Sequence, residues 1–323
     1  MSIKDYLRLI KNFISYYFYV YRTRNVDFFD YEKLARPCAI FAGLTLKPGL
    51  LGNKCYGNWK AIKTAMGDKL DPHNMIEHGI YFGRRILFEE CEMPEISTIY
   101  TYSPYRLEVL KEHYQGKLGK KVVAVGSYIK YAQNFHSEAE LKALKQKYGK
   151  ILLVFPSHPD PSNDTVYDFE EFMREIDRVG KDYDSIFVSM YWVDIVNGKH
   201  KIYKDKGYTI VCSGNRFDPR FLSRQKDLIE LSDMTMSNDL GTHIGYSVAL
   251  NRPHYMFKQK VELNLEHEDA KIVTDLHNIQ SDFDKERNEI QQVFGEYRQE
   301  ITEEQRKVVA YYWGDKVETE IQI

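Results

Sequence analysis

The residues best suited to chemistry lie in a polar turn that runs from Ser237 to His243, between an apolar strand and an apolar helix. The first amides of a helix have no intrahelical acceptor, so this turn suits a phosphate or another anion. Gly241 allows the backbone to approach a ligand closely, and Thr242 offers a hydroxyl and an amide. Ser237 and Asn238 can bind the ligand or cap the helix, and His243 on the first turn can face either way.

A second polar turn, Ser157-His158-Pro159, follows a buried type of strand, Ile-Leu-Leu-Val-Phe. A histidine in such a place can donate a ring N–H to a phosphate or a sugar hydroxyl, and proline keeps the loop in one shape. The alternative is a rigid turn with an exposed histidine. Because another strand in the same half of the chain ends in the anion-ready turn, we expect Ser157, His158 and Pro159 to contact a ligand.

A third strand ends in the tight exit Ser213-Gly214. Arg216, Arg220 and Arg224 follow it, and their fixed positive charge would suit a diphosphate or an acidic sugar. The alternative is a helix start whose arginines are solvated and salt-bridged. We expect Ser213 and Gly214 at the ligand, with at least one of Arg216 and Arg224 facing it.

The first half of the chain offers one candidate base, in the triplet Glu77-His78-Gly79. A carboxylate beside an imidazole can remove a proton from an acceptor hydroxyl, and Gly79 lets the backbone turn sharply. The alternative is a surface glutamate beside a histidine satisfied in the core. Ligands of parallel α/β sheets bind at the carboxyl ends of the strands, where all four polar turns are expected. The sequence therefore predicts Glu77 and His78 on one side of a cleft, opposite the other three turns.

Motifs that would indicate other chemistry do not occur in the sequence. No GxGxxG follows the first strand and no GxxxxGK[ST] loop is present, which argues against nicotinamide and ATP chemistry. No Asp-x-Asp triplet ends a strand, as a metal-held nucleotide diphosphate would need. His73, His78 and His113 lack the helical spacing of a metal site. We therefore expect neither a bound metal nor a resident cofactor.

The composition is typical of a soluble globular protein with room for two domains. Of the 323 residues, 43% are hydrophobic and 28% are charged. The net charge of -2 argues against a dedicated nucleic-acid binder, which would normally be basic. The four cysteines have no paired spacing and are expected to be reduced thiols. No apolar run is long enough to cross a bilayer and no signal peptide is apparent, so we expect a cytoplasmic location.

The first two dozen residues are predicted to form an amphipathic helix, rich in Tyr and Phe and edged by basic residues. Such a helix can lie in a membrane interface, which would suit an enzyme that works on a lipid-linked acceptor. Packing on the protein's own body is the interpretation we favour. Peripheral contact of residues 2–24 with the inner face of the plasma membrane stays open as the alternative.

The elements that must position the polar turns alternate between apolar strands and helices, which is typical of parallel sheets covered on both faces. Strands are predicted at 37–45, 75–82, 96–103, 122–127, 151–157, 185–192, 209–214, 234–237 and 253–257. Helices are predicted at 59–66, 104–114, 137–148, 168–179, 219–231 and 241–251, with a long charged helical stretch without strands at 281–317. Two such α/β units joined near residues 127–136 are the simplest architecture.

This arrangement resembles the GT-B fold of glycosyltransferases, in which two Rossmann-like domains face each other across a cleft. The resemblance covers most of the chain after about residue 37. With the amphipathic helix at 1–30, it implies an acceptor domain at 31–132 and a nucleotide-donor domain at 133–280. It also implies that the final helical segment, 281–323, packs back on the first domain.

Short motifs narrow the resemblance to particular families of bacterial transferases. The turns at His158 and at Ser237–Thr242 are similar to those of bacterial enzymes that use CMP-activated sugars, such as sialyl- and Kdo-transferases. The pairs His78-Gly79 and His158-Pro159 together resemble CDP-glycerol glycerophosphotransferases of teichoic acid synthesis. The chain departs from both families at Glu77-His78-Gly79, which only approximates their acidic triplet. The region around Ser237–Thr242 also looks like proteins encoded among bacterial O-antigen and capsule genes.

The resemblance implies a metal-independent glycosyltransferase that moves a sugar from a CMP- or UDP-linked donor to a glycan or lipid-linked glycan of bacterial surface polysaccharide. His158, Ser237 and Thr242 would then bind the donor, and Glu77 or His78 would act as the base. No nucleic-acid partner is expected. The alternatives are a UDP-sugar 2-epimerase, a CDP-alditol phosphotransferase, and a non-catalytic glycan-binding or scaffold protein.

Overall fold

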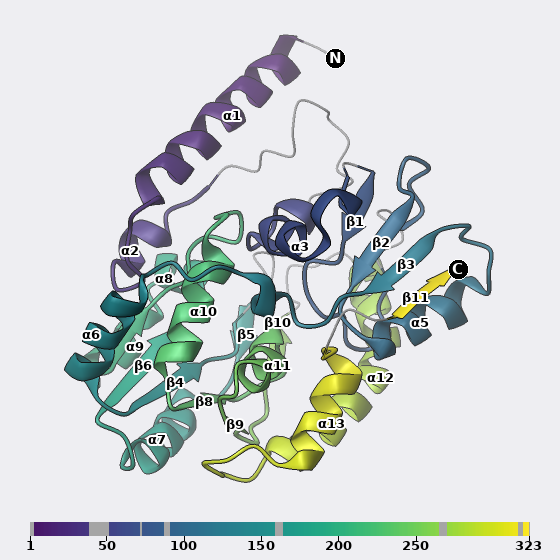
Figure 1. The fold of residues 1–323 in the computed structure, drawn as a ribbon. Coiled ribbons are helices and arrows are strands. Elements are labelled where there is room, and N and C mark those ends of the chain that lie inside the picture. The colour runs from purple at the N-terminus through teal and green to yellow at the C-terminus, as the bar shows by residue number, and fades with distance from the viewer. Residues whose placement is uncertain are drawn as a thin grey trace.

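The computed structural model of the chain describes residues 3–38, 52–71, 73–86, 91–158, 164–264, 270–315 and 319–322. Within them the protein is a mixed α/β structure with two sheets built mainly from parallel strands (Figure 1). The strand predicted at 37–45 lies outside the described residues except for its first two positions, and Pro159 lies outside them as well.

The first sheet joins strands from the first half of the chain to one from its end, in the order β1-β2-β3-β11. Its members are β1 (Asn74–Ile76), β2 (Thr98–Thr101), β3 (Lys121–Ala124) and β11 (Thr319–Gln322). The first three are parallel, and β11 runs antiparallel to β3. The prediction that 281–323 is wholly helical is therefore wrong, because Ile321 packs against the apolar cluster of this sheet.

The second sheet has five parallel strands in the order β7-β6-β4-β8-β9. Its members are β4 (Ile151–Phe155), β6 (Ser185–Ser189), β7 (Thr209–Val211), β8 (Met234–Ser237) and β9 (His254–Met256). Counted within this sheet, the order is 3-2-1-4-5, which is compatible with a Rossmann-like α/β fold. Doubly wound sheets bind ligands where the strand order reverses, and in this sheet that position lies between β4 and β8.

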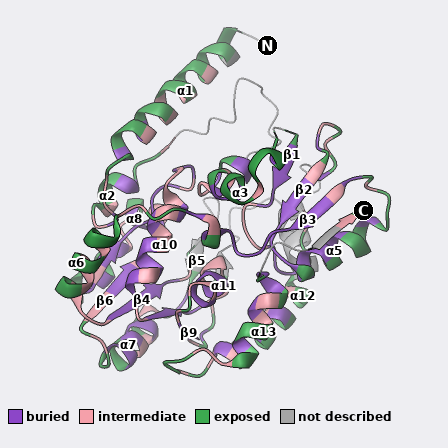
Figure 2. Cartoon of the chain, in the orientation of Figure 1, coloured by how far each residue is buried: buried purple, intermediate pink, exposed green. Residues whose placement is uncertain are grey.

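Helices surround both sheets, and a small antiparallel pair, β5 (Asp164–Val166) with β10 (Glu262–Asn264), stands apart. The strands are buried while the outer helix faces are exposed (Figure 2). In chain order the helices are α1 (Ile3–Thr23), α2 (Tyr31–Leu34), α3 (Asn58–Met66), α5 (Pro104–Tyr114), α6 (Glu138–Tyr148), α7 (Phe169–Gly180), α8 (Trp192–Val196), α9 (His200–Asp205), α10 (Phe221–Leu231), α11 (Thr242–Ala249), α12 (Ala270–Phe294) and α13 (Glu303–Tyr312). The short 3-10 helices are η1 (Gly52–Lys54), η2 (Gly67–Lys69) and η3 (Tyr128–Tyr131).

Local signals set several helix starts. The predicted start of α5 at Pro104 is confirmed, and the Ser103 hydroxyl accepts a hydrogen bond from the Arg106 amide. Helix α6 begins with a capping box in which Ser137 and Glu140 satisfy each other's backbone amides. These starts need no tertiary contact, because each pairs groups only three residues apart.

The C-terminal helical stretch differs from the prediction of one segment at 281–317. Two helices occur there, since α12 ends at Phe294 and a second capping box, formed by Thr302 and Gln305, starts α13. The charge pattern alone hides this break, because both helices are rich in Glu, Gln, Lys and Arg.

The segment after α13 packs against both halves of the chain. Trp313 is fully buried, and a Cβ on Gly245 of α11 would overlap its indole ring. Gly314 has a φ of 73°, and a Cβ there would overlap the Tyr102 carbonyl beside the first sheet. Glu286 of α12 also accepts hydrogen bonds from first-half groups. One buried cluster includes residues near both sheets, so the core is continuous between the two halves.

Candidate functional site

The polar turns of the second half meet at the carboxyl ends of β4, β7 and β8. Ser157 follows β4, and its amide donates a 2.7 Å hydrogen bond to Oδ1 of Asn238, which follows β8. A cavity of about 60 Å³ lies at these strand ends, with His158, Ser213 and His243 in its lining. This volume holds about two water molecules, since each occupies roughly 30 Å³ in the liquid.

His243 lines this cavity and carries a polar atom without a hydrogen-bond partner among the described residues. Its ring stacks on Phe155, with 4.8 Å between ring centroids. Burial, together with nearby His158, lowers the pKa of His243 to about 3, so the ring is neutral at pH 7. The ring hydrogen-bonds to the Asp239 backbone, whereas Nε2 is buried and has no partner among the described residues. Nε2 is therefore left as an acceptor, which suits a ligand hydroxyl.

Gly241 is the N-cap of α11. The absence of a side chain at this position leaves room for the His243 ring, whereas the backbone conformation does not require glycine. Its φ of -175° is extended backbone that any residue adopts. A Cβ at this position would lie 2.5 Å from Cε1 of His243, so any side chain would push the ring from its place. Thr242 begins the helix and is partly exposed, and the first amides of α11 precede its hydrogen-bonded turns.

Two aromatic rings mark the outer edge of the cavity. His158 is exposed and stacks on Tyr191, with 4.2 Å between ring centroids. Tyr191 follows β6 and was not predicted as a site residue, although the strand-end argument that found Ser213 applies to it equally. Its side chain also interacts with that of Tyr56, which belongs to the first half of the chain.

The side chains of Ser237 and Asn238 do not fit their predicted role in donor binding. The Ser237 hydroxyl donates to the Asp239 carbonyl at 3.0 Å and also hydrogen-bonds to Nε2 of His254. The Asn238 amide accepts from Ser157 and donates to Gln259. Both residues are fully buried, so they hold the two turns together and offer a ligand no polar atom.

Of the residues predicted to contact a ligand after β7, some lie near the cavity and one does not. Ser213 is buried against the cavity, and its hydroxyl has no hydrogen-bond partner in the part of the chain that the structure describes. Gly214 has a φ of 120°, in the region that favours glycine, and a Cβ there would lie 3.0 Å from Asp218. Arg224 cannot face a ligand, because it is fully buried and ion-paired with Asp218 at 2.9 Å. The predicted cation at the ligand is therefore Arg216.

Glu77 lies where it does not fit its predicted role as the base. Glu77 and Arg106 are both fully buried and form a two-pronged ion pair, with Nη2 to Oε1 at 2.6 Å and Nε to Oε2 at 3.0 Å. Thr101 donates a further hydrogen bond to the same carboxylate. With its oxygens occupied and no solvent contact, this carboxylate cannot reach an acceptor hydroxyl. The sequence shows the acidic residue but not the arginine 29 positions away.

His78 remains the candidate base. Its Nδ1 lies 2.7 Å from the Tyr81 hydroxyl, and its ring lies 6.4 Å from that of Tyr56. Burial lowers the pKa of His78 to about 4, and the positive charges of Arg216 and Arg85 act in the same direction. The imidazole is therefore neutral at pH 7 and can accept a proton.

Tyr56, which lies beside His78, is hydrogen-bonded to the second half of the chain. Its amide donates to the Arg216 carbonyl at 2.5 Å, and the Leu222 amide donates to the Tyr56 carbonyl at 3.0 Å. Tyr56 has a φ of 58°, an unusual backbone value that no local sequence signal indicates. Through these bonds His78 and Arg216, which are far apart in the chain, become neighbours.

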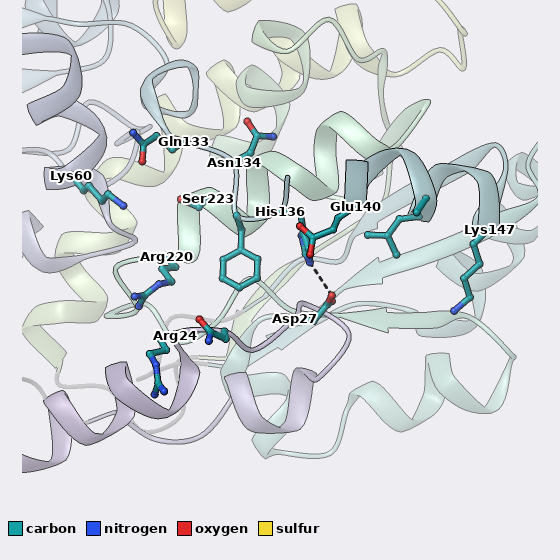
Figure 3. Close-up of a pocket in the computed structure, with 14 residues that line it drawn as sticks. Arg24, Asp27, Lys60, Gln133, Asn134, His136, Glu140, Lys147, Arg220 and Ser223 are labelled. Atoms are coloured by element: carbon teal, nitrogen blue, oxygen red, sulfur yellow. Dashed lines mark hydrogen bonds and ion pairs between the residues drawn. The ribbon is translucent and has the colours of Figure 1, made fainter. Parts of the chain in front are cut away.

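A second opening, here called the basic groove, lies at the N-terminal end of α10, where Arg220 and Ser223 line it (Figure 3). It has a volume of about 740 Å³ and is lined by residues of α3, α6, α10 and two loops. Arg24, Lys60 and Arg220 gather at one end of it (Figure 3). Of its residues only Arg220 was among the candidate cations, and the groove itself was not predicted, because its residues come from five separate stretches of sequence.

His136 lies in the basic groove between two carboxylates. Its Nε2 is 2.9 Å from Asp27 and its Nδ1 is 2.8 Å from Asp227. Burial alone would lower the pKa of His136, but the hydrogen bonds to Asp227 and Asp27 outweigh it and raise the value to about 9. The imidazole is therefore charged at pH 7 and joins the loop after Thr23 to α10.

No group of three or more His, Cys, Asp or Glu side chains within the described ranges is placed to hold a metal ion. Comparison with models of known protein families finds none that matches this chain, and no curated protein has a significantly similar sequence.

Proposed function

We propose that this protein is a glycosyltransferase of the GT-B type, which transfers a sugar from a nucleotide-activated donor to a surface-polysaccharide acceptor. The observation that carries the proposal is that Tyr56 lies against the His78 ring and also donates to the Arg216 carbonyl, which brings both residues to the junction of the two halves. A neutral base, a fixed cation and an open helix N-terminus between two α/β halves are the parts that such a transfer requires.

The donor nucleotide is assigned to the second half, where the strand order reverses between β4 and β8. The first amides of α11 and the Arg216 guanidinium would stabilise the phosphate charge that develops as the donor bond breaks. Nε2 of His243 and the Ser213 hydroxyl, which both lack protein partners in the described chain, would meet ribose or sugar hydroxyls. CMP- and UDP-linked sugars are the donor classes.

The acceptor hydroxyl is assigned to the first-half side, at His78. The imidazole takes the hydroxyl proton, the oxygen forms a bond to the anomeric carbon, and the bond from that carbon to the phosphate oxygen breaks. Negative phosphate near Arg216 would offset the charge that helps to keep the pKa of His78 low, so donor binding makes this base stronger.

A nucleotide does not fit the cavity in this conformation. Ligand sites usually measure about 300 Å³ or more, whereas the cavity measures about 60 Å³. Donor binding therefore requires the contact between Tyr56 and Tyr191 to open, which would widen the space between the two halves.

The test is a thermal-shift panel with CMP, CDP, UMP, UDP, GDP, dTDP and NAD. A ligand at one hundred times its Kd stabilises the folded state by about 2.7 kcal/mol, which raises Tm measurably. We expect a shift with a cytidine or uridine nucleotide, and its loss in Arg216→Met. The matched control is Arg220→Met, which removes an arginine from the basic groove and should leave the shift unchanged.

The pattern of shifts decides between the alternatives. Loss of the shift in Arg220→Met alone would move the nucleotide site to the basic groove and overturn the assignment. No shift with any nucleotide would favour a non-catalytic glycan-binding protein. Release of a free epimer from donor alone would indicate a 2-epimerase, and transfer of an alditol phosphate would indicate a CDP-alditol phosphotransferase.

A further inference from the structure

Helix α1 carries a continuous apolar stripe that the described chain leaves uncovered. Of the thirteen exposed large hydrophobic side chains in the described ranges, nine lie between Ile3 and Tyr21, at spacings of one, three or four residues. Leu7 is 61% exposed and Phe18 is 58% exposed. The other four, Val166, Val196, Ile202 and Tyr311, form no such run, so only α1 presents an extended apolar surface of this kind among the described residues.

The last turns of α1 are fixed to the body of the protein. The Tyr19 hydroxyl donates to the Leu34 carbonyl at 2.9 Å, and the buried guanidinium of Arg224 donates to the Thr23 carbonyl at 2.7 Å. From this attachment the helix extends away from both sheets (Figure 1), and exposed residues follow most of its length (Figure 2). The favoured prediction of a helix packed on the body therefore holds only for its C-terminal end.

The basic residues of α1 lie along one border of the apolar stripe. At 100° per residue, the nine exposed apolar positions occupy an arc of about 140°. Lys4, Arg8, Lys11 and Arg22 fall within an adjoining arc of about 60°, between the stripe and the face that carries Tyr19. The only acidic residue in α1 is Asp5. An apolar face bordered by cations is the pattern of a helix that lies in the plane of a membrane interface.

We propose that α1 docks this protein onto an anionic lipid bilayer, with its apolar stripe among the acyl chains and its four cations at the lipid headgroups. Charge complementarity favours this occupant, because a second copy of α1 would bring four more cations and one carboxylate to the same surface. No described helix is long and apolar enough to cross a membrane, so the contact is peripheral. The proposal does not depend on the proposed glycosyltransferase activity.

The experiment is co-sedimentation of the full chain with vesicles of phosphatidylcholine alone and of phosphatidylcholine with 30% phosphatidylglycerol. We expect binding to the anionic vesicles, and at least a tenfold weaker affinity in the double variant Leu7→Glu/Phe18→Glu. The control is Val196→Glu/Ile202→Glu, which places the same charges on exposed apolar positions outside α1 and should bind normally. The triple variant Lys4→Gln/Arg8→Gln/Lys11→Gln should lose the preference for anionic vesicles.

Circular dichroism and the unfolding midpoint of each variant check that the fold is retained, and the substituted side chains are exposed. Absence of binding to anionic vesicles by the wild type would overturn the proposal, as would equal binding by the Leu7→Glu/Phe18→Glu variant. A lipid-free dimer that becomes monomeric in that variant, with no vesicle binding by the wild type, would assign the stripe to a second copy instead.

Discussion

The strand-end cavity and the basic groove use histidine in opposite ways. His243 at the cavity and His78 beside Tyr56 have no carboxylate partner among the described residues, and burial lowers their pKa values to about 3 and about 4. In the groove, His136 is also largely buried, but Asp27 and Asp227 hold its pKa at about 9. The same side chain is therefore a neutral acceptor in one region and a fixed cation in the other.

This difference separates residues available for chemistry from residues used for structure. A charged imidazole between two carboxylates has no free nitrogen and serves as a link between segments. A neutral imidazole at a cleft keeps a nitrogen that can take a proton or a hydrogen bond. Glu77 is an acid with a structural role, because its pairing with Arg106 leaves no carboxylate oxygen available to act as a base.

The largest expected effect is on catalysis, through His78→Gln. Removing a general base usually slows a reaction by about 10²- to 10⁴-fold, while the stability of the variant should stay close to that of the wild type. The measurement is the rate of sugar transfer with the donor identified in the nucleotide panel, with His113→Gln as the exposed-histidine control. A rate within threefold of wild type would remove His78 from the mechanism.

Glu77→Gln should act on stability instead. Removing one partner of a buried ion pair leaves Arg106 without its counter-charge, and such changes cost about 3–5 kcal/mol. Urea unfolding should show this loss, whereas the pH dependence of turnover by the remaining folded protein should be unchanged. If the variant kept full stability and lost its activity, Glu77 would return as the candidate base.

His136 should make stability depend on pH. Its folded pKa of about 9 is above the ordinary value of 6.5, so its stabilisation is complete below about pH 6.5 and is lost as the pH rises through about 9. Because Asp27 is partly exposed, we expect a change of about 2 kcal/mol between these limits. Denaturant midpoints should follow this curve in the wild type and not in His136→Gln. Parallel curves for the two proteins would show that His136 is not the titrating group.

Gly241→Val should have the smallest effect, confined to the ligand. The new side chain displaces the His243 ring, and we expect nucleotide affinity to fall about tenfold, or about 1.4 kcal/mol. Gly245→Val is the contrasting variant, because its side chain overlaps buried Trp313 and should destabilise the fold itself. Titration calorimetry separates the two effects, and unchanged affinity in Gly241→Val would place the ligand away from α11.

Much of the fold could be predicted from local patterns. Helix starts at Pro104 and Ser137 follow from capping groups three residues apart, and apolar runs such as Ile151–Phe155 mark buried strands. The break between α12 and α13 and the pairing of β11 with β3 could not be predicted, because they depend on partners elsewhere in the chain.

For the site, the residue types at the ends of the parallel strands can be read from the sequence, and Ser213, His158 and His243 do line one cavity. The charge and pairing of each group depend on its surroundings in the folded protein. Arg106, 29 residues from Glu77, holds that carboxylate in an ion pair, whereas burial, helped by the charge of Arg216 138 residues away, keeps His78 neutral. Charge and hydrogen bonding act through space over a few ångströms, so the polar turns show where chemistry could occur and the packing decides which side chains can take part.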